Sequence, residues 1–409
     1  MSSVQLTVPI AASHGAFTTP RTLKLPKGWT ASVWALVPGA RMEAWTPQGD
    51  LLVSQPDLGR VVELAGPGKA GSAALPRQRI LAAGLTSPQG LAFGKVGGRD
   101  VLYIAESDQL DRYEWNADGA VGRRVVIASR LPDLTPAGDD VHREKTVAIG
   151  GNGAVYFNVG SSSNANPDDR TYLPQRAVIM SLRPDGKGLH VVMRGVRNGE
   201  GLARAPDGSM WTAVNNLDNV AYPYHSAYQG VEHAFGKVIQ AYVNEHPPDE
   251  VVRVTTAHDL GWPYCNPLPT KSMTDLPFVP DAINDPGGNH LDCAKLSHIQ
   301  VGLPAHSAPL GMTFLENSQI PAPWSGGALI AAHGSRNRQP PRSPALYWLK
   351  WNSSRHTLEA PVIFAAGFQN PDSTRWGRPV DAVPGPDGAL YVSDDTAGAI
   401  YRLAPPSSS

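Results

Sequence analysis

Several features that would assign this chain to a common class of protein are missing from its sequence. No apolar run approaches the roughly 18 residues of a membrane-spanning helix, so we expect no membrane span. The 35 Lys and Arg residues nearly balance the 36 Asp and Glu residues. The resulting net charge of −1 gives no reason to expect a nucleic acid or a membrane surface as partner. The sequence also lacks the CxxCH motif, which excludes covalently attached c-type haem.

Cysteine is scarce, and a secretory signal is not evident. Cys265 and Cys293 lie in one segment rich in Pro, Gly and Asn. They either form a disulfide, as expected in an oxidising compartment, or are two unrelated buried thiols. The opening residues MSSVQLTVPIAAS have no basic region before their short apolar stretch. The chain is therefore either cytoplasmic or has a start methionine in place of its signal; we favour the disulfide and a periplasmic or secreted protein.

The chain is rich in the residues that make tight turns. Its 409 residues include 41 Gly and 38 Pro without a collagen-like period, which indicates many turns between short strands. A unit of apolar strand, tight turn, apolar strand and polar loop recurs six times, with copies that begin at Arg41, Gly90, Lys145, Gly201, Pro309 and Pro379. Turns that supply the positive φ of tight hairpins contain Gly49, Gly153, Gly208 and Gly388.

These meanders predict an all-β fold, a six-bladed β-propeller of four-stranded antiparallel blades, because a meander cannot bury both its faces alone. The strand-like stretch TLKLPKGWTASVWALV is expected to supply the outer strand of the last blade and close the ring. We divide the chain into an N-terminal extension (1–20), the propeller (21–404) and a disordered tail (405–409). An insertion (222–308) is expected to carry the cysteines and one helix near Ala234–Asn244. An open row of meanders or a sandwich is the alternative.

Strand geometry predicts that polar residues gather at one end of this ring. The glycine turn lies at one end of the first two strands, so the start of the first strand and the exit of the second share the opposite end. Starts of first strands include Arg41, His142, Lys145, Arg197, Asn198, His306, Arg375 and Arg378. Exits of second strands include Ser54, Gln55, Glu106, Asn215, Asn216, Asp218, His333, Arg336 and Arg338. So many cations at one mouth predict a site for a polyanion, through guanidinium–carboxylate pairing. For any single arginine, a bond to loop carbonyls is the simpler alternative.

These residues lie in segments that resemble the dehydrogenases of sugars that use pyrroloquinoline quinone (PQQ). The similarity is to the branch called L-sorbosone dehydrogenase-like, which includes the PQQ domains of fungal pyranose dehydrogenases. It runs from about Leu25 to Leu403 and is carried by LPKGWTASVWALVPGAR, HREKTVAI, VRNGEGLARAPDG, PPDEVV followed by GWPYC, HSAPLGM, HGSRNR and WGRPVDAVPGPDGALYVSDD. The resemblance implies oxidation of a sugar or related alcohol by hydride transfer to PQQ, with Ca²⁺ as second cofactor. An external electron acceptor, a cytochrome or a dye, is then required.

The resemblance also implies a role for individual residues. His142 matches the family's general base, a role that a neutral imidazole suits. Arg197 and Asn198 match the pair that faces the quinone end of the cofactor, with Arg197 counted as catalytic, and Arg41 falls on the substrate side. Cofactor-binding segments contain Asn215, Asn216, His333, Arg336, Arg338, Arg375 and Arg378. Calcium is expected at oxygens of the loop Asn216, Leu217 and Asp218; an ordinary Asx-rich turn is the alternative there.

Three segments depart from the family pattern. The loop SSSNANPDDR lacks cysteines found in many relatives, HGSRNR has an Arg where an aromatic residue is common, and the loop after Val214 lacks the glycine of the soluble glucose enzymes. These departures affect the expected substrate and the calcium geometry more than PQQ binding.

Two other functions are compatible with a propeller. A Ca²⁺-dependent lactonase or esterase, which is a hydrolase, needs several carboxylates around a metal, and only Glu106, Asp218 and Asp394 are expected near this mouth. A non-catalytic binding propeller needs neither the base His142 nor the cationic cluster.

Overall fold

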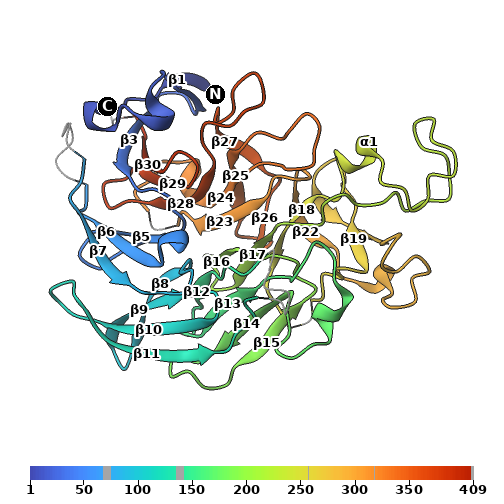
Figure 1. The fold of residues 1–409 in the computed structure, drawn as a ribbon, viewed down its shortest axis with the longest axis horizontal. Coiled ribbons are helices and arrows are strands. Elements are labelled where there is room, and N and C mark those ends of the chain that lie inside the picture. The colour runs from blue at the N-terminus through green and yellow to red at the C-terminus, as the bar shows by residue number, and fades with distance from the viewer. Residues whose placement is uncertain (68–74, 135–141, 257, 317, 407–409) are drawn as a thin grey trace.

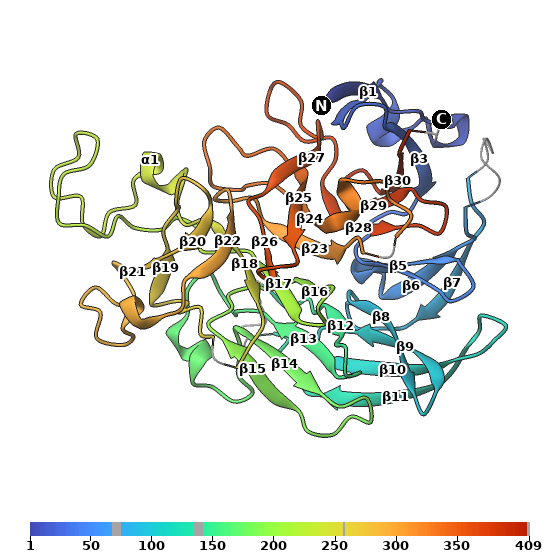
Figure 2. The same ribbon diagram turned by 180° about the vertical axis from the view of Figure 1, so that it is seen from behind.

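The computed structural model describes residues 1–67, 75–134, 142–256, 258–316 and 318–406. Antiparallel sheets are arranged around a common centre, and the chain passes from one to the next in sequence order (Figures 1 and 2). The fold is an all-β propeller with four-stranded antiparallel blades, as predicted. The described part of the chain contains one α-helix, α1 (Gln240–Val243). None of its helices has the length and apolar character needed to cross a membrane.

Four sheets consist of exactly four strands, each ordered from an inner first strand to an outer fourth. One contains β4 (Glu43–Trp45), β5 (Leu51–Gln55), β6 (Arg60–Leu64) and β7 (Gln78–Ala83). The next contains β8 (Leu91–Val96), β9 (Arg99–Ala105), β10 (Gln109–Trp115) and β11 (Val121–Ser129). A third contains β12 (Val147–Ile149), β13 (Val155–Val159), β14 (Val178–Leu182) and β15 (His190–Arg194). The fourth contains β28 (Pro379–Pro384), β29 (Leu390–Asp394), β30 (Ala399–Ala404) and the N-terminal β3 (Thr30–Leu36).

Two larger sheets contain the same meander and additional strands. One has β16 (Gly201–Arg204), β17 (Met210–Val214), β18 (Asp249–Arg253), β22 (Ile299–Leu303) and β20 (Thr274–Leu276). The other has β23 (Pro309–Phe314), β24 (Gly327–Ala332), β25 (Ala345–Asn352), β27 (Val362–Ala366), β2 (Thr22–Leu25) and β1 (Ser2–Gln5), with β26 (Thr357–Leu358) beside β25. A separate pair joins β19 (Cys265–Pro267) to β21 (Phe278–Pro280). Short 3-10 turns occupy Ile10–Ala12, Gly15–Phe17, Pro56–Leu58, Pro167–Arg170, Cys293–Lys295 and Trp324–Gly326.

The two ends of the chain lie side by side. Strand β3 pairs antiparallel with β30 from Thr30 with Ala404 to Leu36 with Ala399, so the blue and red ends of the ribbon meet (Figure 1). The preceding strand β2 instead contacts β27 through Lys24 and Ala366. The predicted N-terminal extension is therefore ordered in part, because β1 pairs with β2. Of the predicted disordered tail, residues 407–409 lie outside the described residues.

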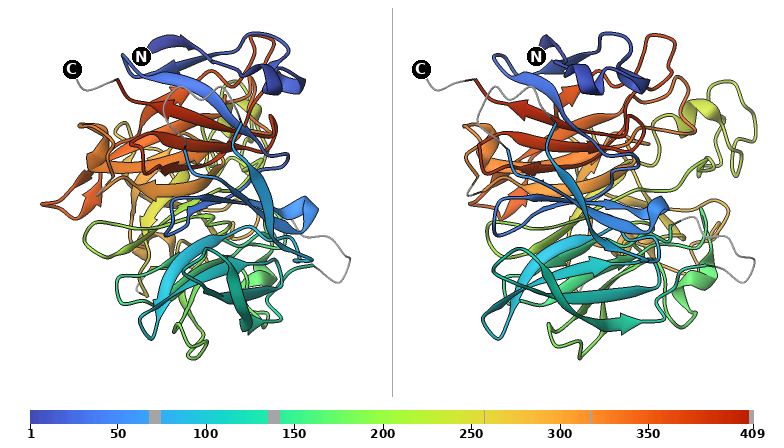
Figure 3. Two further views of the ribbon diagram at one scale, coloured as in Figure 1. Left: turned by 90° about the vertical axis from the view of Figure 1, so that its left-hand side faces the viewer. Right: turned by 60° about the vertical axis from the view of Figure 1, so that its left-hand side comes forward.

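The insertion after β17 projects from one side of the ring (Figures 1 and 3). The helix predicted near Ala234–Asn244 is wrong in extent, because only Gln240–Val243 is α-helical. Gly236, with φ of 73°, precedes this short helix, and a positive φ does not continue a right-handed helix. The prediction of a disulfide is confirmed: Cys265 and Cys293 are bonded, with Cα atoms 5.7 Å apart.

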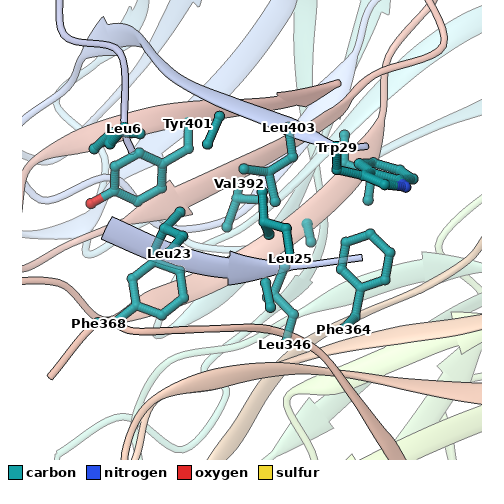
Figure 4. Packing of buried hydrophobic residues seen from close by; sticks show 14 of the residues in the cluster. Leu6, Leu23, Leu25, Trp29, Leu346, Phe364, Phe368, Val392, Tyr401 and Leu403 are labelled. Carbon is teal, nitrogen blue, oxygen red and sulfur yellow. The ribbon is translucent and has the colours of Figure 1, made fainter. Parts of the chain in front are cut away.

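The core consists of apolar side chains between neighbouring sheets. Figure 4 shows the cluster where Leu23 and Leu25 of β2 pack between Phe364 and Phe368 on one side and Tyr401 on the other. The hairpin turns adopt the backbone that their sequences predict; φ is 84° at Gly208 and 76° at Gly388. Because each turn lies between the first and second strands of its sheet, the opposite ends of these strands all reach the same mouth.

Candidate functional site

A cavity of about 580 Å³ opens at that mouth. Its walls come from the residues that precede first strands and from those that follow second strands. Eight predicted site residues line it: Arg41, His142, Arg197, Asn215, Asp218, His333, Arg336 and Arg378. Segments that are far apart in the sequence thus contribute to one polar cavity.

Five predicted residues do not line this cavity. Asn198 lies just beneath it, where its Nδ2 donates to Glu200 Oε1 (2.9 Å). The Asn216 amide turns into the protein and donates to Pro248 O (3.2 Å) and Glu250 Oε1 (2.9 Å), and Leu217 is buried.

The other two are arginines. Arg338 is bound to Glu245 (2.7 Å) and to the carbonyl of Asn244 (3.1 Å), near α1. Arg375 donates to the carbonyl of Ser335 behind the wall. Lys145, placed at the same mouth by its sequence position, is a structural residue: its Nζ donates to the carbonyls of Ser107, Pro132 and Arg143.

His142 is held as a neutral base. Its Nδ1 lies 2.9 Å from Ser161 Oγ, and that hydroxyl donates to the carbonyl of Ser163 (2.7 Å). Since the Ser161 proton is engaged, Nδ1 must donate, which leaves the lone pair on Nε2. Burial, followed by the charge of Arg197, lowers the pKa of His142 well below its ordinary value, although Ser161 offsets part of this shift.

Glycine allows the segment of His142 to approach β13 so closely. A side chain at Gly160, directly after β13, would place its Cβ 2.5 Å from the Cβ of His142. That separation is impossible for real side chains. The glycine after this strand is therefore a positional requirement of the site.

Arg197 is fixed beside this base by the loop after β13. The guanidinium donates to the main-chain and side-chain oxygens of Asn164 (3.1 and 2.9 Å) and to the carbonyl of Asn215 (3.1 Å). Asp218 is more distant, with its Oδ2 3.9 Å from Arg197 Nη2. Because the partners are mostly neutral, burial lowers the pKa of Arg197, while Asp218 and Asp249 offset part of the shift.

A network of charges crosses one wall of the cavity. Arg41 donates to Gln89 (3.0 Å), Glu200 (3.2 Å) and Asp395 (3.1 Å), and His333 Nε2 lies 2.9 Å from the other oxygen of Asp395. Burial lowers the pKa of His333 to about 4 despite Asp395, so at neutral pH the ring donates as a neutral group. Burial raises the pKa of Asp395, but the bonds from His333 and Arg41 hold it below its ordinary value.

The wall next to this network carries cations that are not neutralised. Arg378 donates to the carbonyls of His333 (2.9 Å) and Gly334 (3.4 Å) rather than to carboxylates. Arg336 makes no hydrogen bond or ion pair with any residue that the structure describes. Burial, then repulsion from Arg375, Arg336 and Arg41, lowers the pKa of Arg378 to about 10, although Asp395 opposes this. This wall is therefore complementary to an anion.

Sequence reasoning missed the acidic residues of the site. Asp57, Glu144 and Asp395 line the cavity, whereas of the acids that were expected only Asp218 does. Asp394 instead accepts from Tyr401 Oη (2.9 Å), and Glu106 pairs with Arg124. Successive residues of a strand face opposite sides, so the exit of β29 offered Asp395 as an equal candidate. The role of Ser161 and Asn164 had no signal beyond their place after a second strand.

The site was also tested for metal ligands. Among the described residues, no three His, Cys, Asp or Glu side chains are grouped closely enough to hold a metal ion. Of the predicted calcium loop, Asn216 has its amide engaged inside the protein, and Asp218 presents its carboxylate to the cavity. A calcium ion here would depend on main-chain oxygens and on oxygens of a bound ligand.

Comparison with known proteins agrees with this architecture. The family profile described as TrAA12-like matches residues 23–405. A pyrroloquinoline quinone-dependent pyranose dehydrogenase of Coprinopsis cinerea is 25% identical, in a match that covers 78% of this chain and 52% of that protein. The chain spans about half the length of the curated relatives that it matches.

Solved structures show the same fold. The holo form of the pyranose dehydrogenase PQQ domain of Coprinopsis cinerea has a TM-score of 0.72 at 20% identity, and the match covers 94% of this chain and 97% of that one. The PQQ-bound aldose sugar dehydrogenase of Streptomyces coelicolor has a TM-score of 0.58 at 16% identity, with 93% and 99% covered.

Proposed function

The chain belongs to the TrAA12-like family, and from this premise we propose that it is a PQQ-dependent dehydrogenase that oxidises a sugar or a related alcohol. The names of a curated relative and of two solved structures, pyranose and aldose sugar dehydrogenases, support this class of substrate. As part of this proposal, reducing equivalents leave to an external acceptor, a cytochrome or a dye.

One observation carries the proposal: the same cavity is lined by uncompensated cations and by a neutral histidine. PQQ is a flat tricarboxylate, and carboxylates are the partners that Arg336 and Arg378 lack in the described structure. Placing an anion at this wall would oppose both the burial and the repulsion from neighbouring arginines that lower the pKa of Arg378 to about 10. His333, Arg336 and Arg378 are therefore the proposed cofactor clamp, with Arg375 contributing charge from behind.

His142 is the proposed catalytic residue. PQQ supplies the quinone carbonyl that accepts hydride from the substrate carbon. Nε2 of His142 takes the hydroxyl proton of the substrate, since its lone pair faces away from the Nδ1–H that Ser161 holds. Arg197, fixed by Asn164 and Asn215, places a cation next to this base and favours its neutral state.

Arg41 is the proposed residue on the substrate side. Its three partners hold it rigidly, so it orients hydroxyl groups rather than closing over them. We also propose a Ca²⁺ ion with fewer protein ligands than the sequence predicted. The carboxylate of Asp218 and loop carbonyls would hold it together with cofactor oxygens, and it would act as a Lewis acid. The engaged amide of Asn216 leaves this residue outside the proposed ligand set.

We also propose a ring of six blades that β3 completes, within one domain (21–404) that carries residues 222–308 as an insertion. The strand order β28-β29-β30-β3 and the meanders within the two larger sheets support this count. The disulfide supports a periplasmic or secreted location.

Reconstitution tests the function. Purified apo-protein is incubated with PQQ and Ca²⁺, desalted, and assayed by dye reduction with a panel of aldoses and alcohols. We expect retained PQQ and substrate-dependent reduction, and protein that retains no PQQ would reject the proposal. His142→Ala should retain PQQ but turn over about 10²–10⁴-fold more slowly, the usual contribution of a positioned base. His225→Ala is the control, because His225 stacks on Phe235 outside the cavity.

A further inference from the structure

A second cavity, of about 420 Å³, lies along the axis of the propeller. Its walls are the first strands of all the sheets around the centre, β4, β8, β12, β16, β23 and β28 (Figure 2). It extends to the turn ends of these strands, at Gly150 and Phe314, and thus away from the first cavity. A small apolar cluster separates the two cavities and consists of Met42, Leu310 and Val380. Leu310 lines the first cavity and Met42 lines the second.

Glu43 of β4 is a buried acid of this second cavity that forms no ion pair with a described residue. Its side chain lines the cavity, and the residue is only 5% exposed. Within the described part of the chain, neither carboxylate oxygen makes a hydrogen bond of normal geometry. Leaving a buried carboxylate unpaired is costly, so such a group signals a missing ligand or a retained proton.

Asp381 of β28 is the second acid of the cavity and is 6% exposed. Its Oδ2 accepts from the backbone N–H of Glu43 (3.1 Å) and its Oδ1 from that of Ala382 (2.9 Å). Each carboxylate oxygen has a further lone pair. Only glycine fits opposite, because a Cβ at Gly311 would lie 2.2 Å from Oδ1. The fold thus brings two carboxylates from neighbouring sheets together inside the channel.

A hydroxyl oxygen in the same cavity also lacks a partner. Thr146, directly before β12, is 7% exposed, and its Oγ1 makes no hydrogen bond in the described structure. Its backbone N–H is bound to Asn158 Oδ1 (2.6 Å), which fixes the residue in place. Oxygens without a hydrogen-bond partner in the described structure thus occur on two residue types that line one cavity, and oxygen lone pairs are what a hard cation requires.

The electrostatics agree with this geometry. Burial and repulsion from Asp381 raise the pKa of Glu43 well above its ordinary value, with a small opposing effect of the Ser393 backbone N–H. Burial likewise raises the pKa of Asp381 to about 6. Arg204, the cation among the lining residues, ends β16 and is exposed, so its charge is solvated at the rim. Arg41, which lines the first cavity, lowers the pKa of Asp381, but no cation of the described structure forms an ion pair with either acid.

We propose that the second cavity binds a calcium ion between Glu43 and Asp381, with Thr146 Oγ1 and water completing the ligands. A cation of this class accepts carboxylate, hydroxyl and water oxygens at flexible geometry. Transition metals fit poorly, because the residues that line this cavity include no His or Cys. This site is separate from the cofactor cavity and does not depend on the proposed oxidation.

Calcium titration of the PQQ-free, chelator-treated protein tests the site. Bound Ca²⁺ is counted by equilibrium dialysis, and the melting temperature Tm is followed with and without Ca²⁺, for the parent, Glu43→Gln and Asp218→Asn. We expect the parent and Asp218→Asn to bind Ca²⁺ at this site and Glu43→Gln to lose that binding. At 100 times its Kd, Ca²⁺ should raise the Tm of this 409-residue chain by about 3 °C. Without Ca²⁺, Glu43→Gln should melt at or above the parent temperature, because it removes an unpartnered buried acid.

Two results would overturn the site. One is a parent protein that binds no Ca²⁺ without PQQ, which would mean that Glu43 simply retains a proton. The other is calcium binding that Asp218→Asn abolishes and Glu43→Gln leaves intact, which would assign the ion to the first cavity. Neither result bears on PQQ retention or on dye reduction, so the failure of this site and that of the proposed function are distinguishable.

Discussion

Ser161 should set the tautomer of the catalytic histidine, and Ser161→Ala measures its contribution. The substitution removes the acceptor 2.9 Å from Nδ1 of His142 without touching the cavity wall. Losing one hydrogen bond costs about 0.5–1.5 kcal/mol, and this cost falls on the tautomer that keeps the lone pair on Nε2. At 1.36 kcal/mol per factor of ten, kcat should fall about 2- to 13-fold.

The assay is steady-state dye reduction by PQQ-loaded protein, with KM and PQQ retention measured in parallel. Both should stay at parental values, because Ser161 contacts the base and not the ligands. Ser162→Ala is the matched control, since this neighbouring hydroxyl binds Asp169 (2.7 Å) instead, and Ser161→Thr should restore turnover. If Ser161→Ala turned over at the parental rate, or lost kcat only as far as Ser162→Ala does, the tautomer argument would be wrong.

Two further predictions concern charge. Arg336→Ala should weaken PQQ retention about 10- to 150-fold, because a charge-assisted hydrogen bond is lost. Arg338→Ala should leave PQQ retention unchanged, because Arg338 is paired with Glu245. Equal effects of the two substitutions in a PQQ titration would place the clamp elsewhere. The second prediction concerns the pH dependence of kcat/KM. A general base must be unprotonated, and burial and Arg197 hold the pKa of His142 well below 6.5. The acid limb of kcat/KM should therefore lie well below pH 6.5. Arg197→Gln should move that limb to higher pH, and an unmoved limb would assign it to another group.

The sequence predicted the site where backbone geometry decides, and failed where side-chain partners decide. The repeat fixed which strand ends meet, and this was enough to place Arg41, His142 and Arg378 in one cavity. It could not separate Asp394 from Asp395, because neighbouring residues at a strand exit face opposite sides. It also could not separate Arg336 from Arg338, since the partner of Arg338 is Glu245 in an insertion that has no repeat to align. The helix in that insertion was overpredicted for the same reason.

The distribution of acids around the cavity explains why a cationic mouth can also hold a neutral base. Arg41 is matched by Glu200 and Asp395, whereas Arg336 and Arg378 have no matched carboxylate among the described residues. An anion is therefore drawn to Arg336 and Arg378 rather than to the neutralised Arg41. His142 lies next to buried Arg197, so protonating it would add a second positive charge in a poorly solvated region. Burial and Arg197 thus keep the imidazole in the neutral form that can accept a proton, whereas Arg336 and Arg378 attract the anionic cofactor, so the two tasks depend on different arginines of one cavity.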